Sequence, residues 1–146
     1  MSSQRPDGEL SGCAIDAMID SWQSAVESGQ SYTLALSHSD QLVGCISAGS
    51  LNRRHGTAWM SYWTHSRFRE RGHASAGLMM MSEWCFGELD LYRLELGHRC
   101  NNRASCQVAL RAGYLAEGVE REKLRYGDER YDVELHARLR SDPSPN

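Results

Sequence analysis

Apolar residues recur along this chain with two different periods, and these periods predict its secondary structure. Between Ala14 and Glu27 the apolar positions lie three or four residues apart, which is the spacing of one face of an α-helix. From Ser31 to Ser37 they alternate with polar residues, as in a strand with one buried face. Polar turns then separate two further predicted strands, Gln41–Ser50 and Thr57–Thr64.

Apolar residues surround most of the segment Ala74–Leu89, which predicts a helix packed against a sheet. The remaining predicted elements are a strand at Leu91–Gly97, a helix at Asn102–Ala112 and a closing hairpin of strands Tyr114–Tyr126 and Glu129–Leu139. The second helix has an asparagine suited to an N-cap and a glycine just past its last residue. Together the elements predict an α/β fold with a mixed, mostly antiparallel sheet and one central strand–loop–helix crossover.

Length and charge narrow the class of protein. A chain of 146 residues is expected to form a single domain spanning 1–146, with flexible ends at 1–12 and 141–146. The net charge of −3 offers no basic surface for nucleic acid. No apolar run approaches the ~18 residues that cross a bilayer, so a membrane partner is not expected either.

The cysteines and histidines form no recognisable metal or disulfide pattern in the sequence. The cysteine count is five, which is odd, and no C-x-x-C pair occurs, so we expect reduced thiols and a cytoplasmic location. His65, His73 and His98 have no partner at metal-ligand spacing, so no metal site is expected.

The loop Arg69–Ser75 carries the strongest local chemical signal, because it joins a predicted strand to the start of a predicted helix. A glycine at a helix start leaves several backbone N–H groups free, and the helix dipole makes this end positive. Gly72 would let the backbone approach a phosphate, Ala74 would keep the first turn open, and Arg69 and Arg71 would add charge. The alternative is a basic loop that caps the helix without a ligand.

With the rest of the chain, this loop resembles the RimJ/RimL-type branch of the GNAT superfamily of N-acetyltransferases. The similar segments follow in the same order over more than half of the chain. They are Tyr62-Trp63, Phe68–Ala74, Leu91–Leu96, Asn102–Ser105, Arg111–Tyr114 and Glu117-Gly118. The resemblance implies the acyl-CoA N-acyltransferase fold, with a central strand that splays from its neighbour, and acetyl-CoA as the co-substrate.

The resemblance also implies which residues hold the cofactor. The pyrophosphate would bind the loop, and the pantetheine arm would pair with the end of the central strand and with Asn102. The implied cofactor-binding residues are Trp63, Thr64, Arg69, Arg71, Gly72, His73, Ala74, Ser75 and Asn102. Taken alone, Asn102 is explained by capping its helix, and Trp63 by packing in the core.

Direct acetyl transfer needs a proton acceptor for the amine and a proton donor for the departing thiolate. Glu95 alternates with two leucines on its strand and so faces the other way. The resemblance makes that the acceptor side, so Glu95 is the candidate base, with His98 or a water as alternatives. The resemblance suggests Ser105 as the acid, because the tyrosine that serves in other branches would fall on Ala109. The simpler interpretations are an arginine-paired carboxylate and a polar residue in a cap.

One departure from the family pattern leaves the function open. The family begins with a strand and a helix ahead of the element at Ala14, whereas about a dozen polar residues precede it here. Such a shortened N-terminus would expose a strand edge, which favours a homodimer. The leading hypothesis is transfer of acetyl to a primary amine, either a protein N-terminus or a small molecule. A non-catalytic acyl-CoA-binding module is the alternative, and a nucleotide-binding P-loop is disfavoured because its lysine is missing.

Overall fold

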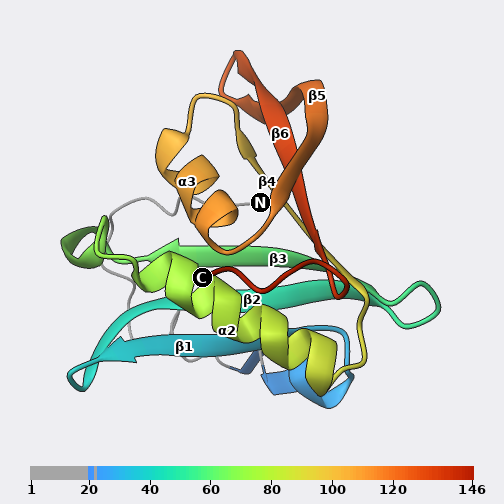
Figure 1. The fold of residues 1–146 in the computed structure, drawn as a ribbon. Helices are drawn as coiled ribbons and strands as arrows, with labels where there is room; N and C mark the ends of the chain where they lie inside the picture. The colour runs from blue at the N-terminus through green and yellow to red at the C-terminus, as the bar shows by residue number, and fades with distance from the viewer. Residues whose placement is uncertain (1–19, 22) are drawn as a thin grey trace.

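The computed structural model describes residues 20–21 and 23–146, and its centre is a six-stranded sheet with the strand order β1-β2-β3-β4-β6-β5. The strands are β1 (Tyr32–His38), β2 (Gln41–Asn52), β3 (Thr57–Thr64), β4 (Arg93–Arg99), β5 (Leu115–Tyr126) and β6 (Glu129–Leu139). The helices that follow are η1 (Ser66–Phe68), α2 (His73–Gly87) and α3 (Arg103–Arg111). Figure 1 shows α2 running across β1, β2 and β3, whereas α3 lies beside β4 and β5.

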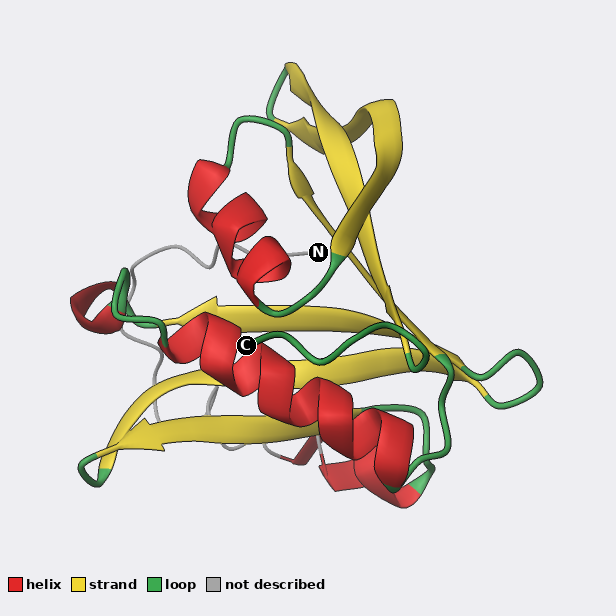
Figure 2. Ribbon diagram, viewed as in Figure 1, coloured by secondary structure: helices red, strands yellow, loops and turns green. Residues whose placement is uncertain are grey.

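All neighbouring strands are antiparallel except β3 and β4, which are parallel. These two strands are paired only at Thr57–Arg93, Ala58–Leu94 and Trp59–Glu95. Beyond the third pair β3 continues to Thr64 beside β2, and β4 continues to Arg99 beside β6. The two strands therefore diverge after Trp59 and Glu95, as the yellow strands of Figure 2 show. The separation between the backbones of β3 and β4 beyond this point is called the opening. The predicted splay of the central strand is confirmed.

The core lies between the sheet and the two helices. Leu78 and Met81 of α2 are buried against Ile46 of β2, Met60 of β3 and Leu94 of β4. Side chains that alternate along each strand supply this single apolar face, as the sequence pattern predicts. α2 approaches the sheet closely, since a Cβ atom placed on Gly77 would lie 3.2 Å from Ile46.

The predicted elements are present with small shifts at their ends. The strand predicted at Leu91–Gly97 is β4, which begins at Arg93 and ends at Arg99. It begins later than predicted because Tyr92 and Arg93 first donate to the carbonyl of Gly56. The helix predicted at Ala14–Glu27 lies largely outside the described residues, although 20–21 and 23–27 are helical. None of the described helices is long and apolar enough to cross a membrane.

Candidate active site

The first turn of α2 is built to receive an anion. Gly72 is its N-cap with φ of +80°, and no side chain of the described residues caps the helix. The first turn also holds no acidic residue. A Cβ atom on Gly72 would meet no atom of residues 20–21 or 23–146 within 4 Å, so these residues leave the space in front of the turn open. The free N–H groups and the helix dipole therefore face solvent, where an anionic group such as phosphate could bind.

Arginine side chains surround this turn. Arg69 and Arg71 are both exposed. The Nε of Arg69 donates to the carbonyl oxygen of Thr64 at 3.3 Å, which fastens the loop to the end of β3. The guanidinium of Arg71 lies 5.7 Å from the centre of the Phe68 ring. The ring of His73 lies 5.0 Å from the ring of His38 at the end of β1, and the two rings are tilted by 48°.

The end of β3 faces the opening between β3 and β4. Tyr62 and Thr64 share the α2 face with buried Met60, whereas Trp63 points to the other face. The Oγ1 atom of Thr64 is buried and has no hydrogen-bond partner among the described residues. A buried hydroxyl without a partner is costly, so this atom fits a ligand that supplies one.

The start of α3 closes the far side of the opening. The Oδ1 atom of Asn102 accepts the N–H of Ser105 at 3.1 Å, which confirms Asn102 as N-cap. Ser105 is buried, with 6% of its surface exposed. Tyr62 donates its hydroxyl to the carbonyl of Ser105 at 3.3 Å, and burial raises the pKa of this tyrosine. Tyr62, which the sequence offered as part of a segment similar to the family but not as a site residue, thus links β3 to α3.

Glu95 lies at the closed end of the opening, where the pairing of β3 and β4 ends. It faces away from the buried side chains of Leu94 and Leu96, as predicted. The Nε of Arg93 donates to Glu95 Oε1 at 2.6 Å. Arg93 also donates from its Nη1 and Nη2 atoms to the two carboxylate oxygens of Glu117, and this hydrogen bonding lowers the pKa of Glu117. One oxygen of the candidate base is therefore already paired, as the simpler interpretation of Glu95 anticipated.

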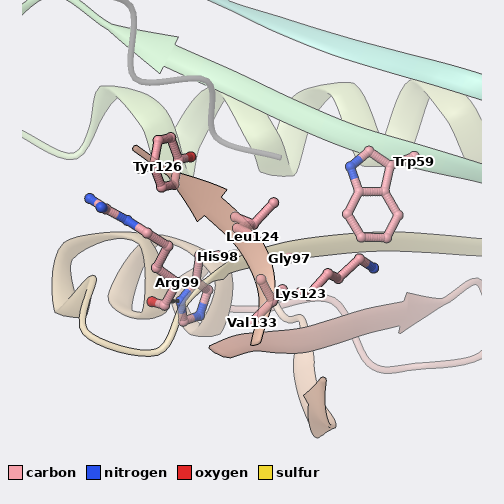
Figure 3. A pocket seen from close by; sticks show the side chains of 8 residues that line it. All are labelled: Trp59, Gly97, His98, Arg99, Lys123, Leu124, Tyr126 and Val133. Atoms are coloured by element: carbon pink, nitrogen blue, oxygen red, sulfur yellow. Dashed lines mark hydrogen bonds between the residues drawn. The ribbon is translucent and has the colours of Figure 1, made fainter. Parts of the chain in front are cut away.

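A pocket opens on the face of the sheet opposite α3, near Glu95. The bulge in β5 brings Lys123 over the ring of Trp59, which neighbours Gly97. At the other end the guanidinium of Arg99 lies 5.2 Å from the ring of Tyr126. Figure 3 shows the lining residues, which are Trp59, Gly97, His98, Arg99, Lys123, Leu124, Tyr126 and Val133. The C-terminal hairpin thus shapes the side of the sheet on which Glu95 lies.

His98, the alternative base, is engaged elsewhere. Its ring is 3% exposed and its Nε2 lies 3.0 Å from Nε2 of His136. Glu134 and Cys106 lie beside this pair. The sequence did not reveal this cluster, because its members come from β4, α3 and β6. The signal that was available is the spacing of Glu134 and His136, which places them on one face of a strand.

The comparison with known proteins decides the family. A model of the acetyltransferase (GNAT) domain matches residues 6–115. The chain belongs to the GNAT acetyltransferase family. A GNAT relative, the ribosomal-protein-serine acetyltransferase of Escherichia coli (strain K12), is 31% identical over 100 residues. The match covers 68% of this chain and 56% of that protein, so the chain spans little more than half of the relative's length.

Solved GNAT structures share the fold. RimJ from Mycobacterium smegmatis, in complex with CoA-disulfide, superposes with a TM-score of 0.83 at 23% identity, over 88% of this chain and 62% of that chain. RimL, a ribosomal alpha-N-protein acetyltransferase in complex with coenzyme A, gives a TM-score of 0.82 at 21% identity, over 89% and 73%. The mixed sheet with its diverging central strands is thus the GNAT fold.

The residues predicted for the site fall into two groups within this GNAT domain. Hydrogen bonds of Arg69 to Thr64 and of Tyr62 to Ser105 bring the loop, the end of β3 and the start of α3 together. Glu95 lies apart from them, at the closed end of the opening.

Proposed function

We propose that this chain transfers an acetyl group from acetyl-CoA to a primary amine by direct attack of the amine on the thioester. The observation that carries the proposal is the divergence of β3 and β4 beside the uncapped start of α2. An unpaired strand edge can hydrogen-bond an amide-containing chain, and a free helix start can bind phosphate. A ligand with a pyrophosphate at one end and a pantetheine arm at the other fits both features.

The cofactor-binding residues follow from this fit. The pyrophosphate would accept from the N–H groups of Gly72, His73, Ala74 and Ser75, and Arg69 and Arg71 would lie beside it. The pantetheine arm would run along the edge of β3, where Trp63 contributes backbone groups. The buried hydroxyl of Thr64 would gain the partner that it lacks. The amide nitrogen of Asn102 would donate to the arm while Oδ1 caps α3.

In the proposed reaction the amine nitrogen forms a bond to the thioester carbon and the carbon–sulfur bond breaks. Glu95 accepts the amine proton directly or through a water, and the hydroxyl of Ser105 gives a proton to the sulfur. Arg93 binds only Oε1 of Glu95, so the second oxygen is available to the amine. The acceptor, either a protein N-terminus or a small-molecule amine, would approach from the side of the sheet on which Glu95 lies.

The ion pair of Glu95 with Arg93 also favours a second candidate function. The guanidinium of Arg93 occupies one oxygen of this carboxylate and so competes with the amine for it. If that interaction persists when the ligands bind, the domain would hold acyl-CoA without turnover. The alternative is therefore a non-catalytic acyl-CoA-binding module.

Turnover on a panel of amines separates the two candidates. The purified protein is mixed with acetyl-CoA and with peptides of varied N-terminal residue, polyamines or aminoglycosides, and the released thiol is measured. Calorimetry with acetyl-CoA alone reports binding. Binding together with release of thiol on at least one amine supports the transferase. Binding with no turnover on any amine supports the binding module, and no binding contradicts both.

A further inference from the structure

The cluster of His98, Cys106, Glu134 and His136, here named the histidine cluster, takes no part in the proposed reaction. Its four potential ligand atoms all lie within 4.8 Å of one another. They come from three elements, because His98 belongs to β4, Cys106 to α3, and the other two to β6. The register of β4 and β6 pairs His98 with Glu134, which brings them together across the sheet.

The hydrogen bonds of the two histidines fix where their protons lie. The Nδ1 of His98 is 2.9 Å from the carbonyl oxygen of Arg99, and the Nδ1 of His136 is 3.3 Å from that of Tyr114. A carbonyl oxygen only accepts, so each Nδ1 must carry the proton. Each neutral ring then presents an unprotonated Nε2. A backbone carbonyl behind the ring is the usual support of a metal-binding histidine.

The unprotonated nitrogens converge on one point with a carboxylate. The two Nε2 atoms are 3.0 Å apart, and Glu134 Oε2 lies 3.3 Å from one and 3.0 Å from the other. Three lone-pair acceptors at these distances need a positive centre between them, either a proton on one Nε2 or a bound cation. Both rings are buried, at 3% and 1% exposure, so bulk water does not screen these lone pairs from one another.

The spacing is close to that around a tetrahedral zinc ion, slightly short between the nitrogen and oxygen atoms and within 4.8 Å for every pair of ligand atoms. Zinc bonds of about 2.0–2.1 Å to nitrogen and about 2.3 Å to sulfur place the ligand atoms roughly 3.3–3.6 Å from one another. Here the nitrogen and oxygen atoms are separated by 3.0 to 3.3 Å, and Cys106 Sγ lies 3.6 Å from Glu134 Oε2. Imidazole and thiolate ligands select zinc over magnesium or calcium. One thiolate and one carboxylate would neutralise the ion, so no net charge would be buried.

We propose that His98, Cys106, Glu134 and His136 form a four-ligand zinc site that fastens α3 to β4 and β6. With four protein ligands the site is closed, as in structural zinc sites, and zinc has no position left for a substrate. Glu134 and Cys106 are only half-buried, which gives the ion a path from solvent. The expected consequence is stability of this part of the fold rather than catalysis.

Cobalt(II) tests the site, because it replaces zinc and reports its ligands by colour. The full chain is stripped of metal by a chelator under reducing conditions and titrated with Co²⁺. We expect one equivalent to produce the visible bands of a tetrahedral site and a thiolate-to-cobalt charge-transfer band. Zn²⁺ should displace the cobalt and raise Tm by roughly 5 °C or more at a hundredfold excess over Kd.

Matched cysteine variants locate the ligand. Cys106→Ala should abolish the charge-transfer band and weaken Co²⁺ binding at least tenfold, whereas Cys100→Ala, at an exposed cysteine outside the cluster, should leave both unchanged. Glu134→Gln, on a half-buried side chain, serves as a second ligand variant where folding of a histidine variant is in doubt. The proposal is overturned if the wild-type chain shows no stoichiometric cobalt bands, or if Cys106→Ala keeps the charge-transfer band.

Discussion

At the scale of single residues, the site depends on groups whose ordinary partners are missing. Among the described residues, Thr64 has a buried hydroxyl without a partner, and Gly72 begins a helix without a side-chain cap. Each would be a defect in a structure that needed only to fold, because unsatisfied polar groups oppose folding. Their position along one opening supports the proposal that they bind a single ligand.

Gly72→Glu should abolish binding of CoA. The side chain would enter the open space before α2 and place a negative charge where the pyrophosphate is expected. Gly72→Ala is the matched control, since it shares the strain of a positive φ without the charge. Calorimetry with CoA gives the two affinities. Equal affinity of the glutamate variant and the wild type would remove the loop from the proposed site.

Glu95→Gln should lower kcat by roughly 100- to 10,000-fold, because glutamine keeps the shape of the side chain but accepts no proton. Affinity for CoA should not change, and Ser105→Ala should cost less because a water can donate instead. The rate of the wild type should rise with pH as the acceptor amine loses its proton.

Glu117→Gln is the control for Glu95→Gln, since it removes the other carboxylate held by Arg93. A similar loss of kcat in both variants would assign the effect to Arg93 rather than to proton transfer. An unchanged kcat and pH profile in Glu95→Gln would remove Glu95 from the mechanism.

At the scale of elements, β2 and β3 must lie unusually close where β3 enters the opening. A Cβ atom on Gly44 would lie 2.0 Å from the carbonyl oxygen of Trp63. Backbone cannot move aside as a flexible side chain can, so the glycine sets the position of the end of β3. The groups of Trp63 and Thr64 that would meet the pantetheine arm therefore depend on a residue outside the site.

Gly44→Ala should destabilise the fold by about 3 kcal/mol or more, because the added methyl forces β2 away from β3. Gly49→Ala on the same strand is the control, since its added Cβ would have its nearest contact at 3.7 Å and should cost less than about 1 kcal/mol. Urea denaturation measures both. Similar stabilities of the two variants would contradict the close approach.

The ion pair of Arg93 in β4 with Glu117 in β5 contributes to the free energy of unfolding, and this contribution depends on pH with a definite sign. Arg93 lowers the pKa of Glu117 in the folded state, so the stabilisation is present above the unfolded pKa near 4.5 and is lost as the pH falls through the folded value. The Glu117 side chain is 45% exposed, so Glu117→Gln should cost no more than about 1 kcal/mol at pH 7. Denaturation measurements at decreasing pH should show the difference in unfolding free energy between the wild type and Glu117→Gln disappear. A difference that stays constant with pH would contradict the stabilising role of the Arg93–Glu117 pair.

The sequence predicted the elements well, because alternation of apolar residues is a local property. β3 was predicted with the bounds it has, and Asn102 caps α3 as expected. The histidine cluster was not predictable in this way, since it depends on which residue of β6 lies opposite His98. The ion pair of Glu95 was anticipated only as one possibility, because a sequence does not show where an arginine side chain points.

At the scale of the whole molecule, the homodimer stays a prediction. In the described residues β1 and β5 are the edges of the sheet, and an edge strand can pair with a second copy. Sedimentation equilibrium at micromolar concentration should give twice the mass of the chain, which is 16.4 kDa. A single monomer mass across that range would contradict it.

Because β3 and β4 are paired over only a short length, the sheet consists of two parts, here called leaves. The short β3–β4 pairing that joins them is called the hinge. One leaf consists of β1, β2, β3 and α2, and the other of β4, β6, β5 and α3. In the described residues β3 pairs with β4 at three positions, next to the hydrogen bonds of Tyr92 and Arg93 to Gly56. The angle between the leaves is then set mainly by side chains packed under the helices. A molecule bound along β3 would hold the two leaves in one relative orientation, and dissociation of that molecule would allow them to move. Loss of product would thus be coupled to a motion of one leaf against the other.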